Sequence, residues 1–344
     1  MVAEAQVKEL MRNKPIVVFI LGPTGAGKSN FAARLAKKID GEIISCDSMQ
    51  VYKGMAIISQ QPPSELRKII PHHLVDILNP SKKWDAASFV ETARKAAGDI
   101  IRRGYIPIFV GGTGLYARAF IKGLFPSPPK DEKLRKALYD EAKRRGKSKL
   151  YKRLMNIDPD YASKIHSNDL RRIVRALEVY KLTGEPISKH HSETKGIENK
   201  YKTLIFILTR DREELYKRID ERVEKMFAQG IVKEVKRLRK KKISKTAKAA
   251  LGFKEVNGYI KGEYGLEEAK ELLKKNTRHY AKRQLTWFRK EQGARWIELG
   301  TEKQNAFLVN AMAGEIKTVH SPQSIDYRPQ TADCKPITRP LNYS

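Results

Sequence analysis

Residues 15–29 read PIVVFILGPTGAGKS, an apolar run followed by the pattern G-x-x-x-x-G-K-S. The run 15–21 is typical of a buried strand, and a helical pattern follows at 30–39. In such a loop backbone N–H groups converge on phosphate oxygens, and Lys28 and the helix N-terminus add positive charge. A glycine-rich turn without a ligand is the alternative, which this placement disfavours. We therefore predict a diphosphate or nucleotide site, with Ser29 as an Mg²⁺ ligand, formed by Gly22, Pro23, Thr24, Gly25, Ala26, Gly27, Lys28 and Ser29.

Further runs rich in Val, Ile and Phe alternate with helical patterns along the chain. They cover residues 42–46, 106–110 and 203–209, and an edge strand is expected at 295–299. This alternation predicts an α/β fold, with a P-loop NTPase-like parallel sheet as its core. Ligands of open α/β sheets bind beyond the carboxyl ends of the strands, so we expect the site at the loop 22–29, at 47–50 and at 111–114.

The chain divides into three parts and a tail. Residues 14–124 are expected to form the first part of the α/β core, and residues 201–300 to complete it with C-terminal helices. Residues 125–200 lack strand signals and carry charged, helix-forming sequence, which predicts a helical insertion domain. Residues 301–344 lose periodicity and gain Pro, Ser, Thr and Gln, so we expect a poorly ordered tail.

The chain is strongly basic, with 69 Lys and Arg against 39 Asp and Glu and a net charge of +30. The excess is clustered, because residues 233–242 contain seven basic residues and one acid. Such a surface attracts a phosphate backbone; solubility or general lysine enrichment is the alternative. We expect a cytoplasmic protein that binds nucleic acid and no membrane, because no apolar run could span a bilayer and no secretory signal precedes residue 15.

Two polar residues at strand ends are candidates for catalysis. Asp47 follows the run 42–46, where an aspartate can hold Mg²⁺ through water, cap the next helix or act as a general base. Thr113 lies in the turn 111–114, which local sequence alone equally allows to be an ordinary strand-to-helix turn. The histidine pairs at 72–73 and 190–191 do not favour a metal site, because adjacent residues seldom face one ion.

Together these segments resemble the tRNA dimethylallyltransferases, or tRNA isopentenyltransferases. The resemblance runs in order from about residue 14 to residue 299. Its segments are GPTGAGKS (22–29), DSMQVYKGM (47–55), PHHLVDI (71–77), GGTGLY (111–116), HSND (166–169), RRIVRALE (171–178), TGEP (183–186), LGFKE (251–255) and NTRHYAKRQLTW (276–287).

The resemblance implies a reaction and its partners. Members of the family transfer a dimethylallyl group from dimethylallyl diphosphate to the exocyclic N6 amine of the adenosine immediately 3′ of the anticodon in tRNA, and pyrophosphate leaves. The loop 22–29 with Mg²⁺ would hold the diphosphate, Asp47 would accept the amine proton, and Thr113 would orient the amine. Nothing in the sequence requires more than a monomer.

The resemblance also implies which residues contact tRNA. Without it, the arginines at 171–175 are typical of a solvated helix face, and the basic residues at 278–283 of intrahelical pairing. The implied contacts are Asp47, Ser48, Met49, Gln50, Thr113, Arg135, Arg171, Arg172, Ile173, Val174, Arg175, Gly252, Lys254, Arg278, Lys282, Arg283 and Gln284.

One segment departs from the family pattern. Where the family commonly reads Asp-Ile-Gly-Thr-Ala-Lys-Pro, residues 56–62 read AIISQQP, so an acid and a lysine are missing. Ser48 favours tRNA over free AMP, because the related adenylate isopentenyltransferases usually carry Lys there. Two rival classes remain: a small-molecule kinase leaves the basic insertion unexplained, and a noncatalytic RNA-binding module leaves Lys28 and Asp47 unexplained. Trp287 and Phe288 are expected in the core.

Overall fold

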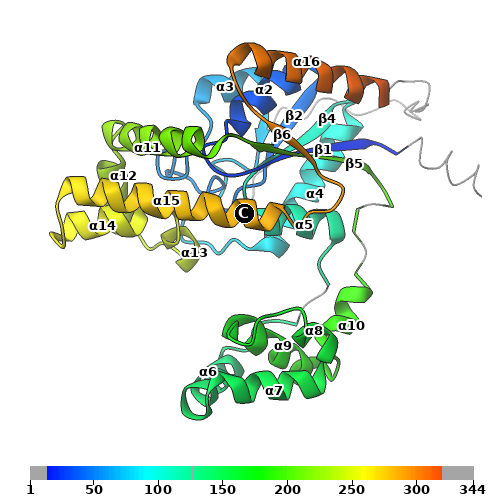
Figure 1. Cartoon of the computed structure of the whole chain (residues 1–344), viewed down its shortest axis with the longest axis vertical. Coiled ribbons are helices and arrows are strands. Elements are labelled where there is room, and N and C mark those ends of the chain that lie inside the picture. Colours follow the sequence, from blue (N-terminus) through cyan, green and yellow to red (C-terminus); the bar gives the residue numbers. More distant parts are fainter. Residues whose placement is uncertain (1–13, 126–127, 195, 198, 320–344) are drawn as a thin grey trace, which may run out of the picture. The chain divides into compact units, whose positions relative to one another are not determined.

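A computed structural model describes residues 14–125, 128–194, 196–197 and 199–319 of the chain (Figure 1). They form two compact units. The core unit comprises the residues up to 118 and from 198 onward, and the insertion unit comprises residues 119–197. The insertion predicted at 125–200 thus begins six residues earlier in the structure, within a helix, and ends three residues earlier.

The core unit is built on one parallel sheet of six strands in the order β3-β2-β4-β1-β5-β6. The strands are β1 (Ile16–Leu21), β2 (Gly41–Ser45), β3 (His72–His73), β4 (Ile106–Gly111), β5 (Lys202–Thr209) and β6 (Arg295–Glu298). The predicted α/β fold is confirmed, and every predicted run is a strand. The sequence did not indicate β3, because two residues carry no periodicity. Since all strands are parallel, their carboxyl ends meet at one edge.

Helices flank the sheet, and the C-terminal helices predicted within residues 201–300 include the long helices α11 and α15 (Figure 1). The helices that lie wholly in the core unit are α2 (Lys28–Lys38), α3 (Ser64–Ile69), α4 (Ala86–Arg102), α11 (Arg212–Ala228), α12 (Ile231–Arg239), α13 (Lys245–Lys248), α14 (Phe253–Lys261), α15 (Leu266–Phe288) and α16 (Glu302–Val319). α5 (Gly114–Lys122) leads from the core unit into the insertion unit. No helix among the described residues is long and apolar enough to cross a membrane.

The two faces of the sheet bury alternate residues of each strand. Val18 and Ile20 of β1 pack with Phe31 of α2 on one face. On the other face Phe19 stacks on Phe109 of β4, with ring centroids 4.7 Å apart. Strands covered on both faces read as continuous apolar runs, which is why the sequence located β1 and β4 well.

Helix α16 corrects the predicted tail. Residues 302–319 are helical, and Val309, Met312 and Ile316 are buried against the face that α2 covers. Their spacing of three and four is helical, so the signal was present, but the polar composition of the whole segment obscured it. Residues 320–344 lie outside the described residues.

The regular elements described in the insertion unit downstream of α5 are all helices, in agreement with the helical insertion predicted from the sequence. Its helices are α6 (Glu132–Arg145), α7 (Lys147–Ile157), α8 (Pro159–Ala162), α9 (Leu170–Thr183) and α10 (Ile187–Ser192). They enclose a core of their own, in which Leu150, Leu154 and Leu177 are almost completely buried.

Candidate active site

The loop 22–29 joins β1 to α2 in a conformation that its glycines permit. Gly22, Gly25 and Gly27 have φ angles of +142°, +86° and +97°. A Cβ at Gly22 would lie 2.2 Å from the Leu208 carbonyl oxygen of β5, so only glycine fits there. Because α2 begins at Lys28, its positive N-terminal end faces the loop. Lys28 Nζ donates to the Pro23 carbonyl at 2.7 Å.

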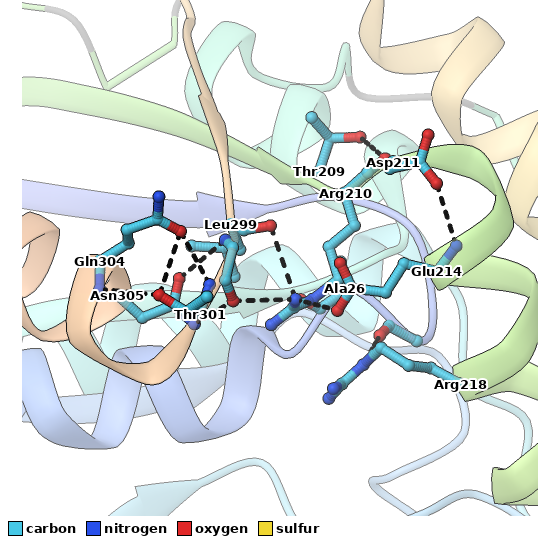
Figure 2. Close-up of polar contacts among 12 residues, drawn as sticks. Ala26, Thr209, Arg210, Asp211, Glu214, Arg218, Leu299, Thr301, Gln304 and Asn305 are labelled. Carbon is cyan, nitrogen blue, oxygen red and sulfur yellow. Dashed lines mark hydrogen bonds and ion pairs between the residues drawn. The ribbon is translucent and has the colours of Figure 1, made fainter.

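Three arginines that the sequence prediction missed bind this loop through hydrogen bonds. Arg210 Nε donates to the Ala26 carbonyl at 3.0 Å, and Arg218 Nε to the Gly25 carbonyl at 3.0 Å (Figure 2). Arg222 donates to Thr24 Oγ1 at 3.1 Å. A signal was available, because Arg218 and Arg222 are four residues apart and therefore share one face of α11.

Asp47 and Thr113 connect the turns that follow β2 and β4. Asp47 Oδ1 accepts hydrogen bonds from the backbone N–H groups of Met49 at 2.8 Å and Gln50 at 3.4 Å. Thr113 Oγ1 accepts from the Ser48 N–H at 3.2 Å, and the Thr113 N–H donates to the Cys46 carbonyl at 3.3 Å. Among the described residues no donor reaches Asp47 Oδ2, so that oxygen is available to a ligand.

A cavity of about 330 Å³ opens at the carboxyl edge of the sheet. It brings part of the phosphate loop together with the Asp47 turn, the end of β4 and side chains from α11 and α15. Its lining includes Thr24, Lys28, Ser29, Asp47, Ser48, Met49, Gln50, Gly111, Gly112, Arg222, Tyr280, Arg283 and Gln284. Apolar side chains line another part, namely Ile58, Val223, Met226, Leu251 and Leu273. The cavity therefore suits a ligand with an anionic end and a short hydrocarbon end.

Two basic residues that line the cavity, Lys28 and Arg222, have no carboxylate within ion-pair distance among the described residues. Burial and, to a smaller extent, the charge of Arg222 together lower the pKa of Lys28 to about 7, while the Asp47 carboxylate opposes that shift. Burial likewise lowers the pKa of Arg222 to about 10, while the Asp47 carboxylate opposes that shift. A diphosphate would relieve this mutual repulsion, so the pair forms an anion site.

The segment 56–61, which departs from the family pattern, is tied into the structure by side-chain hydrogen bonds. Gln61 Nε2 donates to the carbonyls of Gln50 and Tyr52, each at 2.9 Å. The buried carboxylate of Glu234 accepts from the backbone N–H groups of Ile57 at 3.1 Å and Ile58 at 2.8 Å. The missing acid and lysine therefore leave no loose segment beside the cavity.

Helix α15 closes one side of the cavity. Gln284 accepts from the Thr24 N–H at 2.9 Å and donates to the Gly112 carbonyl at 2.8 Å, so it connects the two glycine-rich turns. Tyr280 lies beside Asp47 and Thr113, and burial raises its pKa. The Arg283 guanidinium is exposed and lies 5.7 Å from the Tyr280 ring centroid. Phe288 is buried as expected; Trp287 is half-buried beneath the Arg118 guanidinium.

Other predicted tRNA contacts of the core unit lie outside the cavity lining. Arg278 pairs with Asp220 of α11 at 2.6 Å, which is an interhelical ion pair and not the intrahelical one considered above. Lys254 and Lys282 are exposed. Gly252 is buried at the start of α14 with φ +99°.

The predicted contacts of the insertion unit divide into three groups. Arg171 and Arg172 are exposed on α9. Arg135 and Arg175 instead bind the fully buried carboxylate of Glu178, Arg135 through two bonds of 2.8 Å. The side chains of Ile173 and Val174 are buried in the helical core, so the prediction that these residues contact tRNA can apply only to their backbone.

The described residues contain no group of three or more His, Cys, Asp and Glu side chains that could hold a metal ion. The histidines of β3 have other partners: a His72 ring nitrogen lies 2.6 Å from the Ile70 carbonyl, and one of His73 lies 2.7 Å from Glu42. Mg²⁺ bound with a diphosphate needs few protein ligands, and the Ser29 hydroxyl and the Asp47 carboxylate, both of which line the cavity, fit that requirement.

The fold and the site define a class: a transferase with a phosphate loop, whose cavity pairs an anion site with a carboxylate and an apolar wall. Comparisons with known proteins specify the family. The family model "IPP transferase" matches residues 50–291, and the model "Isopentenyl transferase" matches residues 15–76. The chain therefore belongs to the IPP transferase family.

Curated relatives agree with this assignment. The chain is 46% identical over 297 residues to a tRNA dimethylallyltransferase of Halothermothrix orenii, and the aligned residues make up 86% of this chain and 90% of the relative. It is 49% identical over 288 residues to a tRNA dimethylallyltransferase of Carboxydothermus hydrogenoformans, covering 83% and 93%.

Solved structures show the same fold. A tRNA isopentenylpyrophosphate transferase of Bacillus halodurans matches with a TM-score of 0.64 and 37% identity, covering 90% of this chain and 99% of that one. A eukaryotic dimethylallyltransferase, described as acting on tRNA, matches with a TM-score of 0.73 and 33% identity, covering 89% and 80%.

Proposed function

We propose that the protein transfers a dimethylallyl group from dimethylallyl diphosphate to the N6 amine of the adenosine immediately 3′ of the anticodon in tRNA. One observation carries the proposal: a single cavity joins the phosphate loop, the Asp47 carboxylate and an apolar wall. The relatives named tRNA dimethylallyltransferases and the net charge of +30 support tRNA as the acceptor.

In the proposed reaction the adenosine nitrogen attacks the allylic carbon, the bond from that carbon to the diphosphate oxygen breaks, and pyrophosphate leaves with the bonding electrons. Lys28, Arg222 and the amides of the loop 22–29 stabilise the charge that builds on the leaving group. Asp47 accepts the proton that the amine loses, and Thr113 fixes the turn that presents Asp47. The wall that includes Val223, Met226 and Leu273 holds the hydrocarbon and keeps water from the reactive carbon.

We infer that Mg²⁺ serves this reaction as a cofactor. Ser29 would hold it together with diphosphate oxygens, where it would neutralise charge on the leaving group. A cytoplasmic location is part of the same proposal, since tRNA is the partner, and so is a monomeric state.

Incubation with labelled dimethylallyl diphosphate, Mg²⁺ and either tRNA, AMP or no acceptor tests the proposal. We expect label in tRNA and none in AMP, and digestion of the tRNA should yield N6-dimethylallyladenosine. Transfer of the γ-phosphate of ATP to a small molecule, without label in tRNA, would identify a kinase. RNA binding without either transfer would identify a noncatalytic RNA-binding protein.

A further inference from the structure

The basic stretch 233–248 is not explained by the cavity. It runs from α12 through the connection to α13, and its basic side chains are all exposed. They are Lys233, Lys236, Arg237, Arg239, Lys240, Lys241, Lys242, Lys245 and Lys248. We call these nine side chains the basic strip.

Almost none of the positive charges in the basic strip is paired with an acidic side chain. Arg237 alone of its members has an ion pair among the described residues, with Glu234 at 4.0 Å. Glu234, the one acid of the stretch, is buried and points inward to the N–H groups of Ile57 and Ile58. The positive charge of the strip therefore faces solvent.

On helix α15, by contrast, several basic side chains form ion pairs with acids. Lys270 and Lys274 of α15 both pair with Glu224 of α11, at 3.2 and 2.7 Å, and each also pairs with an acid three residues earlier on its own helix. Arg278 pairs with Asp220. Acids thus neutralise these cations of α15, whereas in the strip Arg237 alone has an acid within ion-pair distance among the described residues.

The strip is held firmly and leads directly to the cavity. Ile231, Val235 and Leu238 of α12 and Ile243 are buried beneath it. The Ser244 N–H donates to the Pro80 carbonyl at 2.8 Å, and Arg237 donates to the Gly54 carbonyl at 2.8 Å. Immediately after α13, Ala249 and Leu251 line the cavity. A polyanion on the strip would therefore approach the cavity rim.

We propose that the basic strip is a docking surface for the phosphate backbone of the tRNA substrate, on the side from which the target adenosine enters the cavity. This inference rests on the proposed function. Lys233, Lys236, Arg237 and Lys240 recur at intervals of three and four, so they form one stripe along α12, and Lys241 to Lys248 extend it toward Ala249. An ordered row of exposed cations, of which Arg237 alone has an ion pair among the described residues, is complementary to a nucleic-acid backbone and binds it by counterion release.

The test compares two triple variants with equal loss of charge. The strip variant is Lys240→Gln, Lys241→Gln and Lys242→Gln. The control is Lys37→Gln, Lys38→Gln and Lys317→Gln, whose lysines are exposed and without ion pairs among the described residues, on the packed helices α2 and α16 that Figure 1 places apart from α12 and α13. The affinity of full-length tRNA is measured over a range of salt concentrations, with thermal melting to verify folding.

We expect the strip variant to bind tRNA about tenfold more weakly at 0.15 M salt and to lower the slope of log affinity against log salt by about 2 to 3. The KM for dimethylallyl diphosphate should stay unchanged, and the control should bind tRNA as the unmodified protein does. An equal loss in both variants would indicate net charge alone and would overturn the inference, as would unchanged affinity in the strip variant. Absence of transfer by the unmodified protein would refute the proposed function separately, because the affinity comparison does not depend on turnover.

Discussion

The cavity and the insertion unit use basic side chains in opposite ways. Lys28 and Arg222 bond only to a carbonyl and a hydroxyl of the loop and have no carboxylate partner within ion-pair distance among the described residues. Arg135 and Arg175 instead surround the buried carboxylate of Glu178. Unpaired charge costs folding stability and remains available to an anionic ligand, whereas paired charge serves the fold. The role of a lysine or arginine therefore depends on whether a carboxylate is paired with it.

Replacing Lys28 gives the largest expected effect on the cavity side of this comparison. Lys28→Met should slow transfer at saturating substrates by about 1,000-fold, or about 4 kcal/mol, because a charge that stabilises the departing pyrophosphate is lost. Thermal stability should not fall, since a buried charge without a carboxylate is removed. Single-turnover rates and melting curves measure both. A variant that melts earlier and retains its rate would make Lys28 a structural residue.

Replacing Glu178 tests the insertion side. Glu178→Gln should destabilise the insertion unit by about 3 kcal/mol, because Arg135 and Arg175 lose their buried carboxylate. Hydrogen exchange of α6 and α9 measures the change. Glu185→Gln is the matched control, because Glu185 forms an exposed pair with Lys189 of α10 and should have no measurable effect. Unchanged exchange in Glu178→Gln would contradict a structural role for the cluster.

The lowered pKa of Lys28 predicts how anion binding depends on pH. The free protein releases the Lys28 proton near pH 7, and bound diphosphate raises that pKa again, so binding above pH 7 takes up a proton. The affinity for inorganic pyrophosphate should weaken by up to about tenfold per pH unit above 7, and calorimetry in two buffers at pH 8 should detect up to about one proton taken up. Lys28→Met should show neither effect. Proton uptake that persists in Lys28→Met would assign it to another group.

The lowered pKa of Lys28 also makes folding stability depend on pH, and stability changes with pH in the direction opposite to anion affinity. Between pH 7 and 10.5 the unfolded chain holds the Lys28 proton and the folded chain does not. The contribution of this group to the free energy of unfolding therefore increases as pH rises through that window. Pyrophosphate should abolish the increase, because it restores the proton in the folded state.

The smallest expected effect concerns the exposed arginines of α9. Arg171 has no ion pair among the described residues, whereas Arg172 pairs with Asp169 at 3.3 Å. Arg171→Gln should weaken tRNA binding a few-fold, about 1 kcal/mol, without a change in melting temperature. Arg172→Gln should have less effect, since its charge is partly neutralised. An equal loss of tRNA affinity in the two variants would show that an ion pair does not decide which arginine contacts RNA.

The sequence predicted the sheet well but did not indicate the ion pairs of the insertion unit, for a physical reason. Strands buried on both faces, such as β1, leave uninterrupted apolar runs, and the glycines of the loop 22–29 occupy positions that only glycine tolerates. The pairing of Arg135 with Glu178 joins residues 43 positions apart and leaves no local pattern. Arg210, which binds the Ala26 carbonyl behind the loop, depends on a similarly distant contact and was missed for the same reason.

Asp47 offers the most direct test of the proposed chemistry. Asp47→Asn retains an oxygen that can accept the N–H groups of Met49 and Gln50, so the turn is preserved while the basic carboxylate is lost. Single-turnover transfer to saturating tRNA should fall about 1,000-fold, within the range expected for a general base, while tRNA affinity stays within a few-fold. Transfer at an unchanged rate, or a rate that falls only as much as tRNA affinity does, would contradict the assignment of Asp47 as the residue that accepts the amine proton.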